Sequence, residues 1–190
     1  GRKNAQYALF PYYTDDKITA LAETTGCKTI FRIIAQESTK LWEPFSERQA
    51  GLYDITRNIY KNTFGNKIVF EEINNDLELT FKYEWNSSDK FGFVRKATLV
   101  NNANANVNVE TLDGFQDIIP FGIGSDLQAN VSNLADAYKK CELEENVGLG
   151  IYALSAIIVD KAEPSEALKA NIVWSLGINN PTYLLSSLQI

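Results

Sequence analysis

Leu77-Glu78-Leu79-Thr80-Phe81-Lys82-Tyr83-Glu84-Trp85 alternates apolar and polar side chains without a break. A period of two places the apolar side chains on one face of a β-strand and the polar ones on the other. The stretch therefore predicts a half-buried strand whose apolar face needs a second layer to cover it.

The neighbouring segments repeat this pattern, and together they predict consecutive antiparallel strands from Tyr53 to Leu112. The strands are expected at residues 53–60, 68–73, 77–85, 91–100 and 107–112, with turn signals at Gly65-Asn66, Asn74-Asn75-Asp76 and residues 101–106. We expect a mainly β chain in which this meander forms one layer of an antiparallel β-sandwich.

Further strands are expected on both sides of the meander, at residues 28–34, 148–159, 166–176 and 183–190. Pro11 interrupts a ladder, so residues 4–18 predict an edge strand or an extended arm. Pro44 keeps Glu43 out of the α region, which makes residues 41–45 short and extended.

One short helix is expected near residues 125–140. Ser125 or Asp126 is a suitable cap, and the apolar residues that follow have helical spacings of 4, 3 and 4, at Leu127, Val131, Leu134 and Tyr138. Lys139-Lys140 would then lie near the C-terminal end of the helix dipole.

Composition limits the function classes. The 190 residues, 45% of them hydrophobic, suit a single domain covering 1–190. A net charge of −6 without a basic run argues against nucleic acid, and no apolar run is long enough to span a bilayer. Localisation stays open between cytoplasmic and exported.

The sequence contains no histidine and only two cysteines, Cys27 and Cys141. Histidine-dependent triads, histidine general bases and zinc sites are therefore excluded. We predict no catalytic residue, no metal and no cofactor. Free thiols are the favoured interpretation of the cysteines, with a disulfide as the alternative.

Carboxylates are the remaining catalytic material. Adjacent Glu71 and Glu72 point to opposite faces of a strand, so they cannot act as one acid–base pair. Asp113 and Asp117 flank a glycine turn, where turn chemistry is the favoured interpretation. The acidic cluster after the helix is expected to be a solvent-facing loop, at Glu142, Glu144 and Glu145.

Aromatic rings such as Trp42 and Trp85 suit either the core or a flat platform for a sugar ring, with the core favoured for each. The charged stretch 160–166 lies between apolar strands and suits a solvated face or a contact with another domain.

Several phrases together resemble a known family. They are Leu41-Trp42-Glu43-Pro44-Phe45-Ser46-Glu47-Arg48, Phe70-Glu71-Glu72-Ile73-Asn74, Phe91-Gly92-Phe93-Val94-Arg95-Lys96, Leu112-Asp113-Gly114-Phe115-Gln116-Asp117-Ile118-Ile119-Pro120, and residues 159–170. The chain is similar to the N-terminal region of cellobiose-phosphorylase-like and glycoside-hydrolase-like bacterial proteins.

The resemblance implies a β-supersandwich of the galactose-mutarotase-like kind, which precedes an (α/α)6 catalytic barrel. It implies a non-catalytic scaffold whose partner is the catalytic domain of the same polypeptide, missing from this chain. The apolar strand pattern that runs to Ile190 agrees with a fragment of a longer protein.

We therefore expect a non-catalytic domain of a glycoside hydrolase or phosphorylase. The alternatives are a stand-alone carbohydrate-binding module and a surface protein-interaction domain. The candidate contacts to sugar or to a neighbouring domain are Trp42, Trp85, Asp113, Gln116, Glu163 and Glu166.

Overall fold

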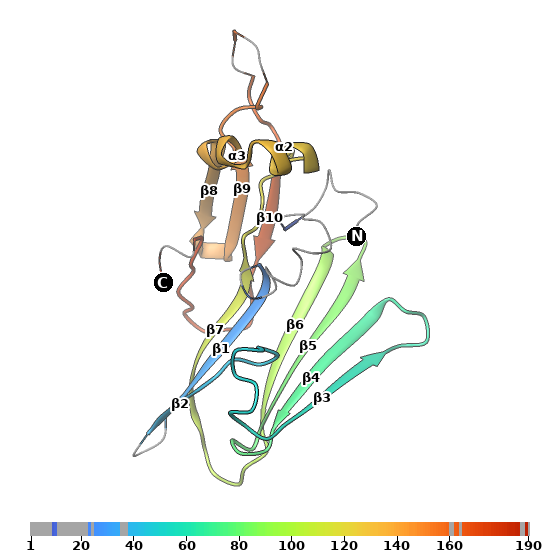
Figure 1. Cartoon of the computed structure of the whole chain (residues 1–190), viewed down its shortest axis with the longest axis vertical. Helices are drawn as coiled ribbons and strands as arrows, with labels where there is room; N and C mark the ends of the chain where they lie inside the picture. The colour runs from blue at the N-terminus through green and yellow to red at the C-terminus, as the bar shows by residue number, and fades with distance from the viewer. Residues whose placement is uncertain are drawn as a thin grey trace. The chain divides into compact units, whose positions relative to one another are not determined.

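A computed structural model of the chain describes residues 9–10, 23, 25–34, 38–159, 162–163, 165–186 and 189. Within these residues the protein is mainly β, with three antiparallel sheets and two short α-helices (Figure 1). The strands are β1 (Gly26–Ile34), β2 (Thr39–Trp42), β3 (Ile55–Lys61), β4 (Lys67–Asn74), β5 (Leu79–Ser88), β6 (Gly92–Asn101), β7 (Asn108–Gln116), β8 (Lys139–Glu144), β9 (Leu149–Leu154) and β10 (Ala170–Trp174). The helices are α2 (Ser125–Asn130) and α3 (Ser132–Tyr138).

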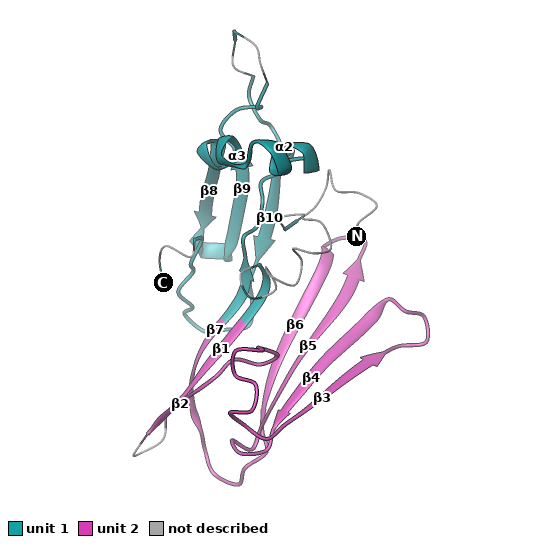
Figure 2. Cartoon of the chain, viewed as in Figure 1, with its two compact units in different colours: residues 1–28, 113–190 teal, residues 29–112 magenta. Residues whose placement is uncertain are grey.

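The chain divides into two compact units (Figure 2). Unit 1 contains Gly1–Lys28 and Asp113–Ile190, and unit 2 contains Thr29–Leu112. The boundary falls within β1 and β7. The single domain over 1–190 stays a prediction.

Unit 2 contains the predicted meander as a four-stranded antiparallel sheet in the order β3-β4-β5-β6. One row of the sheet runs from Arg57 through Glu72 and Phe81 to Leu99. The strand β5 begins at Leu79 rather than Leu77, because the Leu77 amide donates to Asn74 Oδ1 at 3.0 Å and keeps the turn closed.

The core of unit 2 is built from the apolar face of β5 and from residues of β1 and β2. Its buried members are Phe31, Ile33, Trp42, Leu79 and Phe81. Phe31 lies edge-on to Phe81, with ring centroids 5.2 Å apart, in the T-shaped geometry that aromatic pairs prefer. Of the alternating residues 77–85, Leu79 and Phe81 are buried in this core, and Leu77 and Tyr83 pack against it.

Unit 1 contains the sheet β10-β9-β8 and both helices. The predicted single helix is wrong in its extent, because the chain breaks at Val131, where φ is −142° and ψ is 43°. Of the predicted apolar stripe, Leu127 and Tyr138 pack on the core of this unit, whereas Val131 and Leu134 are exposed.

Lys139 is the C-cap of α3, so Lys139 and Lys140 do follow a helix C-terminus as predicted, and they also begin β8. Glu142 and Glu144 lie in that strand rather than in a loop. Glu145 starts the short 3₁₀ turn Glu145–Val147, which ends at Gly148 with φ +61°. A Cβ on Gly148 would approach the Ser175 carbonyl oxygen to 2.7 Å, so only glycine fits.

Other boundaries also differ from the sequence predictions. The strand expected at 107–112 was to be followed by a turn at Gly114, but Gly114 is extended and β7 continues to Gln116. Residues 183–186 are not in a strand, and the rest of the predicted last strand lies outside the described residues. The predicted arm at 4–18 also lies outside them, apart from Leu9 and Phe10.

Candidate functional site

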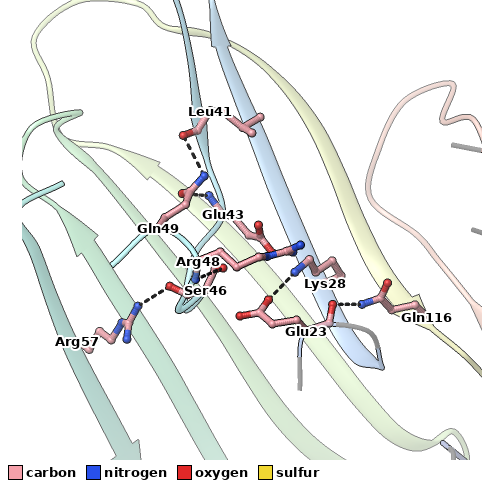
Figure 3. Close-up of polar contacts among 9 residues, drawn as sticks. All are labelled: Glu23, Lys28, Leu41, Glu43, Ser46, Arg48, Gln49, Arg57 and Gln116. Atoms are coloured by element: carbon pink, nitrogen blue, oxygen red, sulfur yellow. Dashed lines mark hydrogen bonds and ion pairs between the residues drawn. The ribbon is translucent and has the colours of Figure 1, made fainter. Parts of the chain in front are cut away.

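The six candidate contact residues are divided between the two units. Trp42 and Trp85 belong to unit 2, and the other four belong to unit 1, so neither unit contains the whole set. Trp85, Asp113 and Gln116 are half-buried, whereas Glu163 and Glu166 are exposed. Gln116 Nε2 donates to the Glu23 carbonyl oxygen at 3.3 Å, and Lys28 pairs with the Glu23 carboxylate at 2.9 Å (Figure 3).

Trp42 is a core residue, with only 1% of its surface exposed. Its ring lies 5.4 Å from that of Phe31, measured between centroids. Its indole Nε1 donates to Glu72 Oε1 at 2.9 Å, which satisfies the one polar atom of the side chain. The ring of Trp42 therefore has no open face for a sugar.

Glu72 is the centre of a buried polar network in unit 2. It occupies the same face of β4 as Phe70 because side chains two residues apart share a face. Only 1% of the surface of Glu72 is exposed. Its carboxylate accepts three hydrogen bonds, from Trp42 Nε1, from the Phe45 amide at 2.7 Å and from Arg57 Nε at 2.8 Å. The arginine compensates the buried charge, as a buried carboxylate requires.

The loop after β2 folds over this carboxylate. Glu43, which is also buried, pairs with Arg48 at 2.8 Å, and its amide donates to Gln49 Oε1 at 2.9 Å (Figure 3). Arg57 Nη2 donates to the Ser46 carbonyl oxygen at 3.3 Å (Figure 3). These contacts fix residues 43–49 on the sheet.

Phe45 adopts a left-handed backbone conformation, with φ +66°. A residue with a Cβ is strained there by about 1–2 kcal/mol. Two contacts hold the strained residue in place, the hydrogen bond from its amide to Glu72 and the edge-on packing of its ring against Tyr83 at 5.3 Å. Backbone strain of this kind persists where the surroundings over-determine the conformation.

A small cavity lies among these groups, with a volume of about 10 Å³. It is lined by Trp42, Glu43, Ser46, Gln49, Tyr53, Ile55, Arg57 and Glu72. This volume corresponds to roughly one water molecule, whereas a ligand pocket measures about 300–1,000 Å³. The network therefore has the chemistry of a carboxylate site without room for a sugar, and its contacts anchor the loop to β4.

Glu71 points to the opposite face of the same sheet, which confirms the prediction that it cannot pair with Glu72. It accepts hydrogen bonds from Asn58 Nδ2 at 3.0 Å and Tyr60 Oη at 2.9 Å, and it pairs with Lys82. The hydrogen bond from Lys82 holds the pKa of the Glu71 carboxyl below its usual value, against burial that raises it.

We expect Glu71→Gln to remove a part of the stability that depends on pH. A carboxyl with a lowered pKa in the folded state stabilises the fold above its unfolded pKa of about 4.3, and this contribution is lost as pH falls. The variant should be less stable than the parent at pH 7, and the difference should shrink between about pH 5 and pH 3. Urea unfolding at pH 7, 5 and 3 measures it, and a difference that stays constant would contradict the assignment.

Asp117, for which turn chemistry was favoured from the sequence, follows β7 with φ +54°. Burial raises the pKa of its carboxyl, with Lys139 acting in the opposite direction. Among the described residues no group of histidine, cysteine, aspartate and glutamate is arranged to hold a metal ion. Cys27 and Cys141 are free thiols, as favoured from the sequence.

Neither described helix is long and apolar enough to cross a membrane. No model of a known protein family matches the chain, and no protein of curated function matches its sequence. The function proposed below therefore depends on residues and geometry, together with the resemblance described above.

The network around Glu72 was not predicted from the sequence. One signal was present: Ile68, Phe70, Glu72 and Asn74 alternate onto the core-facing side of β4. A carboxylate in an apolar row requires a buried partner, which predicts an arginine nearby. The partner itself, Arg57, becomes visible only with the register of β3 on β4.

Proposed function

We propose that the chain is a non-catalytic β-sandwich domain of a carbohydrate-active enzyme of the glycoside hydrolase or phosphorylase type. In this proposal the sandwich is a supersandwich of the galactose-mutarotase-like kind. It serves as a scaffold for an (α/α)6 catalytic domain of the same polypeptide, and the reaction takes place on that domain.

The observation that carries the proposal is how the buried carboxylates are used. Glu72 and Glu43 are engaged by Arg57, Arg48, Trp42 and the Phe45 amide, around a space for one water molecule. Glycoside hydrolysis needs two carboxyl groups that flank a bound sugar with about 5–10 Å between them. Carboxylates that hold a loop in place suit a scaffold.

The packing in unit 2 supports the sandwich. β1 and β2 contribute Phe31, Ile33 and Trp42 to the face of the sheet that carries Leu79 and Phe81. Two layers of side chains that interdigitate in this way are the building principle of β-sandwiches. The phrase from Leu41 to Arg48, which carries part of the family resemblance, forms the end of β2 and the anchored loop.

Turnover assays test this proposal. The purified 190-residue chain, incubated with disaccharides and with glycosyl phosphates plus acceptor, should release no product, whereas the longer polypeptide that contains a helical domain should. Glycoside cleavage by the 190-residue chain would overturn the proposal. A longer polypeptide without a helical catalytic domain would overturn it as well.

The alternative of a stand-alone carbohydrate-binding module requires an exposed aromatic platform. Trp42 is buried and Trp85 is half-buried, so Trp85 is the tryptophan of unit 2 that remains a candidate for such a platform. Calorimetric titration with a panel of oligosaccharides separates the two functions. Saturable binding that is lost in Trp85→Ala, with the fold intact, would favour the binding module over the scaffold.

A further inference from the structure

One end of the four-stranded sheet of unit 2 carries two hairpin turns. One turn joins β3 to β4 and the other joins β5 to β6. The register places both at the same end of the sheet, since Lys67 at the start of β4 lies opposite Asn86, near the end of β5 (Figure 1). Residues 61–67 and 88–96, which form the two turns and the strand ends beside them, make up what we call the paired tips.

Large apolar side chains of the paired tips face solvent. Phe64, in the first turn, is 89% exposed, and Phe93, near the start of β6, is 78% exposed. Phe91, in the second turn, is 52% exposed. Single exposed hydrophobic residues are common on protein surfaces, but a group of them marks a surface that binds a partner or a membrane.

The paired tips are basic, although the whole chain has a net charge of −6. Their one acidic residue is Asp89, against the basic residues Lys61, Lys67, Lys90, Arg95 and Lys96. Two of these cations are held on unit 2 itself, because Lys67 pairs with Glu84 at 2.9 Å and Arg95 Nη2 donates to Thr29 Oγ1 at 3.1 Å.

Lys61 and Lys90 lie at the tips themselves, beside the exposed rings. Lys61 bends over its own turn, with its Nζ 3.5 Å from where a Cβ on Gly65 would lie. Lys90 Nζ lies 5.2 Å from the centroid of the Phe91 ring. Each turn therefore combines a phenylalanine with an ammonium group.

The opposite end of the same sheet has a different composition. Its turns, at residues 75–78 and 102–107, contain Asp76 and Glu78 and no basic residue. None of the described residues in these two turns is a large exposed hydrophobic one. The apolar and basic character thus belongs to one end of the sheet and is not a general property of its turns.

We propose that the paired tips bind the surface of a lipid bilayer that contains anionic lipids. Phe64 and Phe93 enter the interface between the headgroups and the acyl chains, and Lys61 and Lys90 contact the phosphates of the headgroups. Apolar burial and attraction to anionic lipids are each weak anchors, and together they give stable binding at the interface.

The side chains favour a bilayer over a sugar or a protein as the partner. Sites for sugars and for proteins use aromatic residues with a polar atom, tryptophan and tyrosine above all, whereas the exposed rings of the paired tips are phenylalanines. The overall charge of −6 opposes binding little, because exposed charges farther away than about 8 Å are screened at physiological salt.

Co-sedimentation of the 190-residue chain with vesicles tests this proposal. The chain should pellet with vesicles of phosphatidylcholine and phosphatidylglycerol in equal parts, and it should stay in the supernatant with vesicles of phosphatidylcholine alone. Binding to the anionic vesicles should weaken as salt concentration rises, because salt screens the lysines.

Variants of the rings test the apolar contact. Phe64→Ala and Phe93→Ala should each lower the partition coefficient to anionic vesicles about tenfold, because each removes a ring that is buried in the interface. Leu168→Ala is the matched control, since Leu168 is 85% exposed and lies in unit 1. It should leave the partition coefficient unchanged.

Variants of the lysines test the charged contact. Lys61→Gln and Lys90→Gln should each lower the partition coefficient about fivefold. Lys40→Gln is the matched control, because Lys40 is an exposed lysine of the same unit in β2, away from the paired tips, and it should change the coefficient little.

A fluorescence experiment tests whether the tip enters the bilayer. Phe64→Trp should gain a blue-shifted emission with anionic vesicles, relative to the parent chain, and brominated phosphatidylcholine should quench it. A chain that stays in the supernatant with anionic vesicles at low salt would overturn the proposal. So would binding that Phe64→Ala and Lys61→Gln leave unchanged, or binding without quenching of Phe64→Trp. The turnover assays of the enzymatic proposal are independent of these results.

Discussion

Replacing Glu72 by alanine is expected to destabilise the protein by about 3 kcal/mol, because it removes the common acceptor of a buried network. Trp42 Nε1 and the Phe45 amide would lose their partner at a site that is closed to bulk water. A buried donor left without an acceptor costs about 1–3 kcal/mol. Arg57 adds less, since its side chain is 42% exposed and can turn toward solvent.

The second effect of this change is on the loop. The amide of Phe45 donates to Glu72 while its backbone is in the left-handed region, so the loss of the carboxylate releases one restraint on a strained residue. We expect residues 43–49 to become more accessible to proteases and to amide hydrogen exchange. Exchange rates in β5 should change less, because Phe81 and Leu79 keep their own core contacts.

Glu47→Ala is the matched control. Glu47 pairs with the same guanidinium, at 3.3 Å from Arg57 Nη1, but its side chain is 80% exposed. Exposed ion pairs contribute about 0–1 kcal/mol, so this variant should unfold close to the parent. Urea unfolding of both variants at pH 7 measures the difference in their free energies of unfolding. The midpoints can be compared directly if the free energy falls with urea concentration at the same slope in both variants. Equal destabilisation by the two changes would contradict the anchoring role of Glu72.

The meander was predictable because its signals are local. Alternation over residues 77–85 indicates a strand and which of its faces is apolar. The turn residues on both sides indicate that consecutive strands pair antiparallel, and none of these signals depends on the rest of the chain. The same reasoning placed Glu71 and Glu72 on opposite faces, and the two separate sets of partners confirm it.

Predictions that depended on tertiary context were less successful. The spacing of Leu127, Val131, Leu134 and Tyr138 describes one helix, yet the chain breaks at Val131 and begins β8 at Lys139. The start of β8 at Lys139 is determined by pairing with β9, because each residue of the extended segment Lys139–Glu144 has a partner on β9. A sequence window cannot contain that information, because propensity is a weak prior that tertiary contacts override.

The candidate contact residues illustrate the same limit. Aromatic residues carry no mark in the sequence that separates core from surface, and Trp42 and Trp85 therefore looked equivalent. The structure separates them through their neighbours: Trp42 meets Phe31 and Glu72, whereas Trp85 lies between Ile68 and Arg95 in the sheet register.

Trp42→Ala is expected to be the most destabilising single change, at about 4 kcal/mol. The side chain is among the largest that are fully buried, and its removal leaves a cavity beside Phe31 in the core of unit 2. It also removes the donor to Glu72 Oε1, which leaves a buried carboxylate oxygen with one partner fewer. A loss of this size is a large share of the 5–15 kcal/mol that typically holds a domain folded.

Trp42→Phe separates the two contributions, because phenylalanine keeps most of the packing and lacks the indole N–H. We expect it to cost about 2 kcal/mol, from the lost hydrogen bond and the smaller ring. Chemical unfolding followed by circular dichroism measures both variants, since it does not depend on the fluorescence of the replaced residue. If Trp42→Ala cost less than about 1 kcal/mol, the ring would not be a core element, and its use as a sugar platform would have to be considered again. The ordering parent, Trp42→Phe, Trp42→Ala would identify Trp42 as the side chain that joins the apolar core to the carboxylate network.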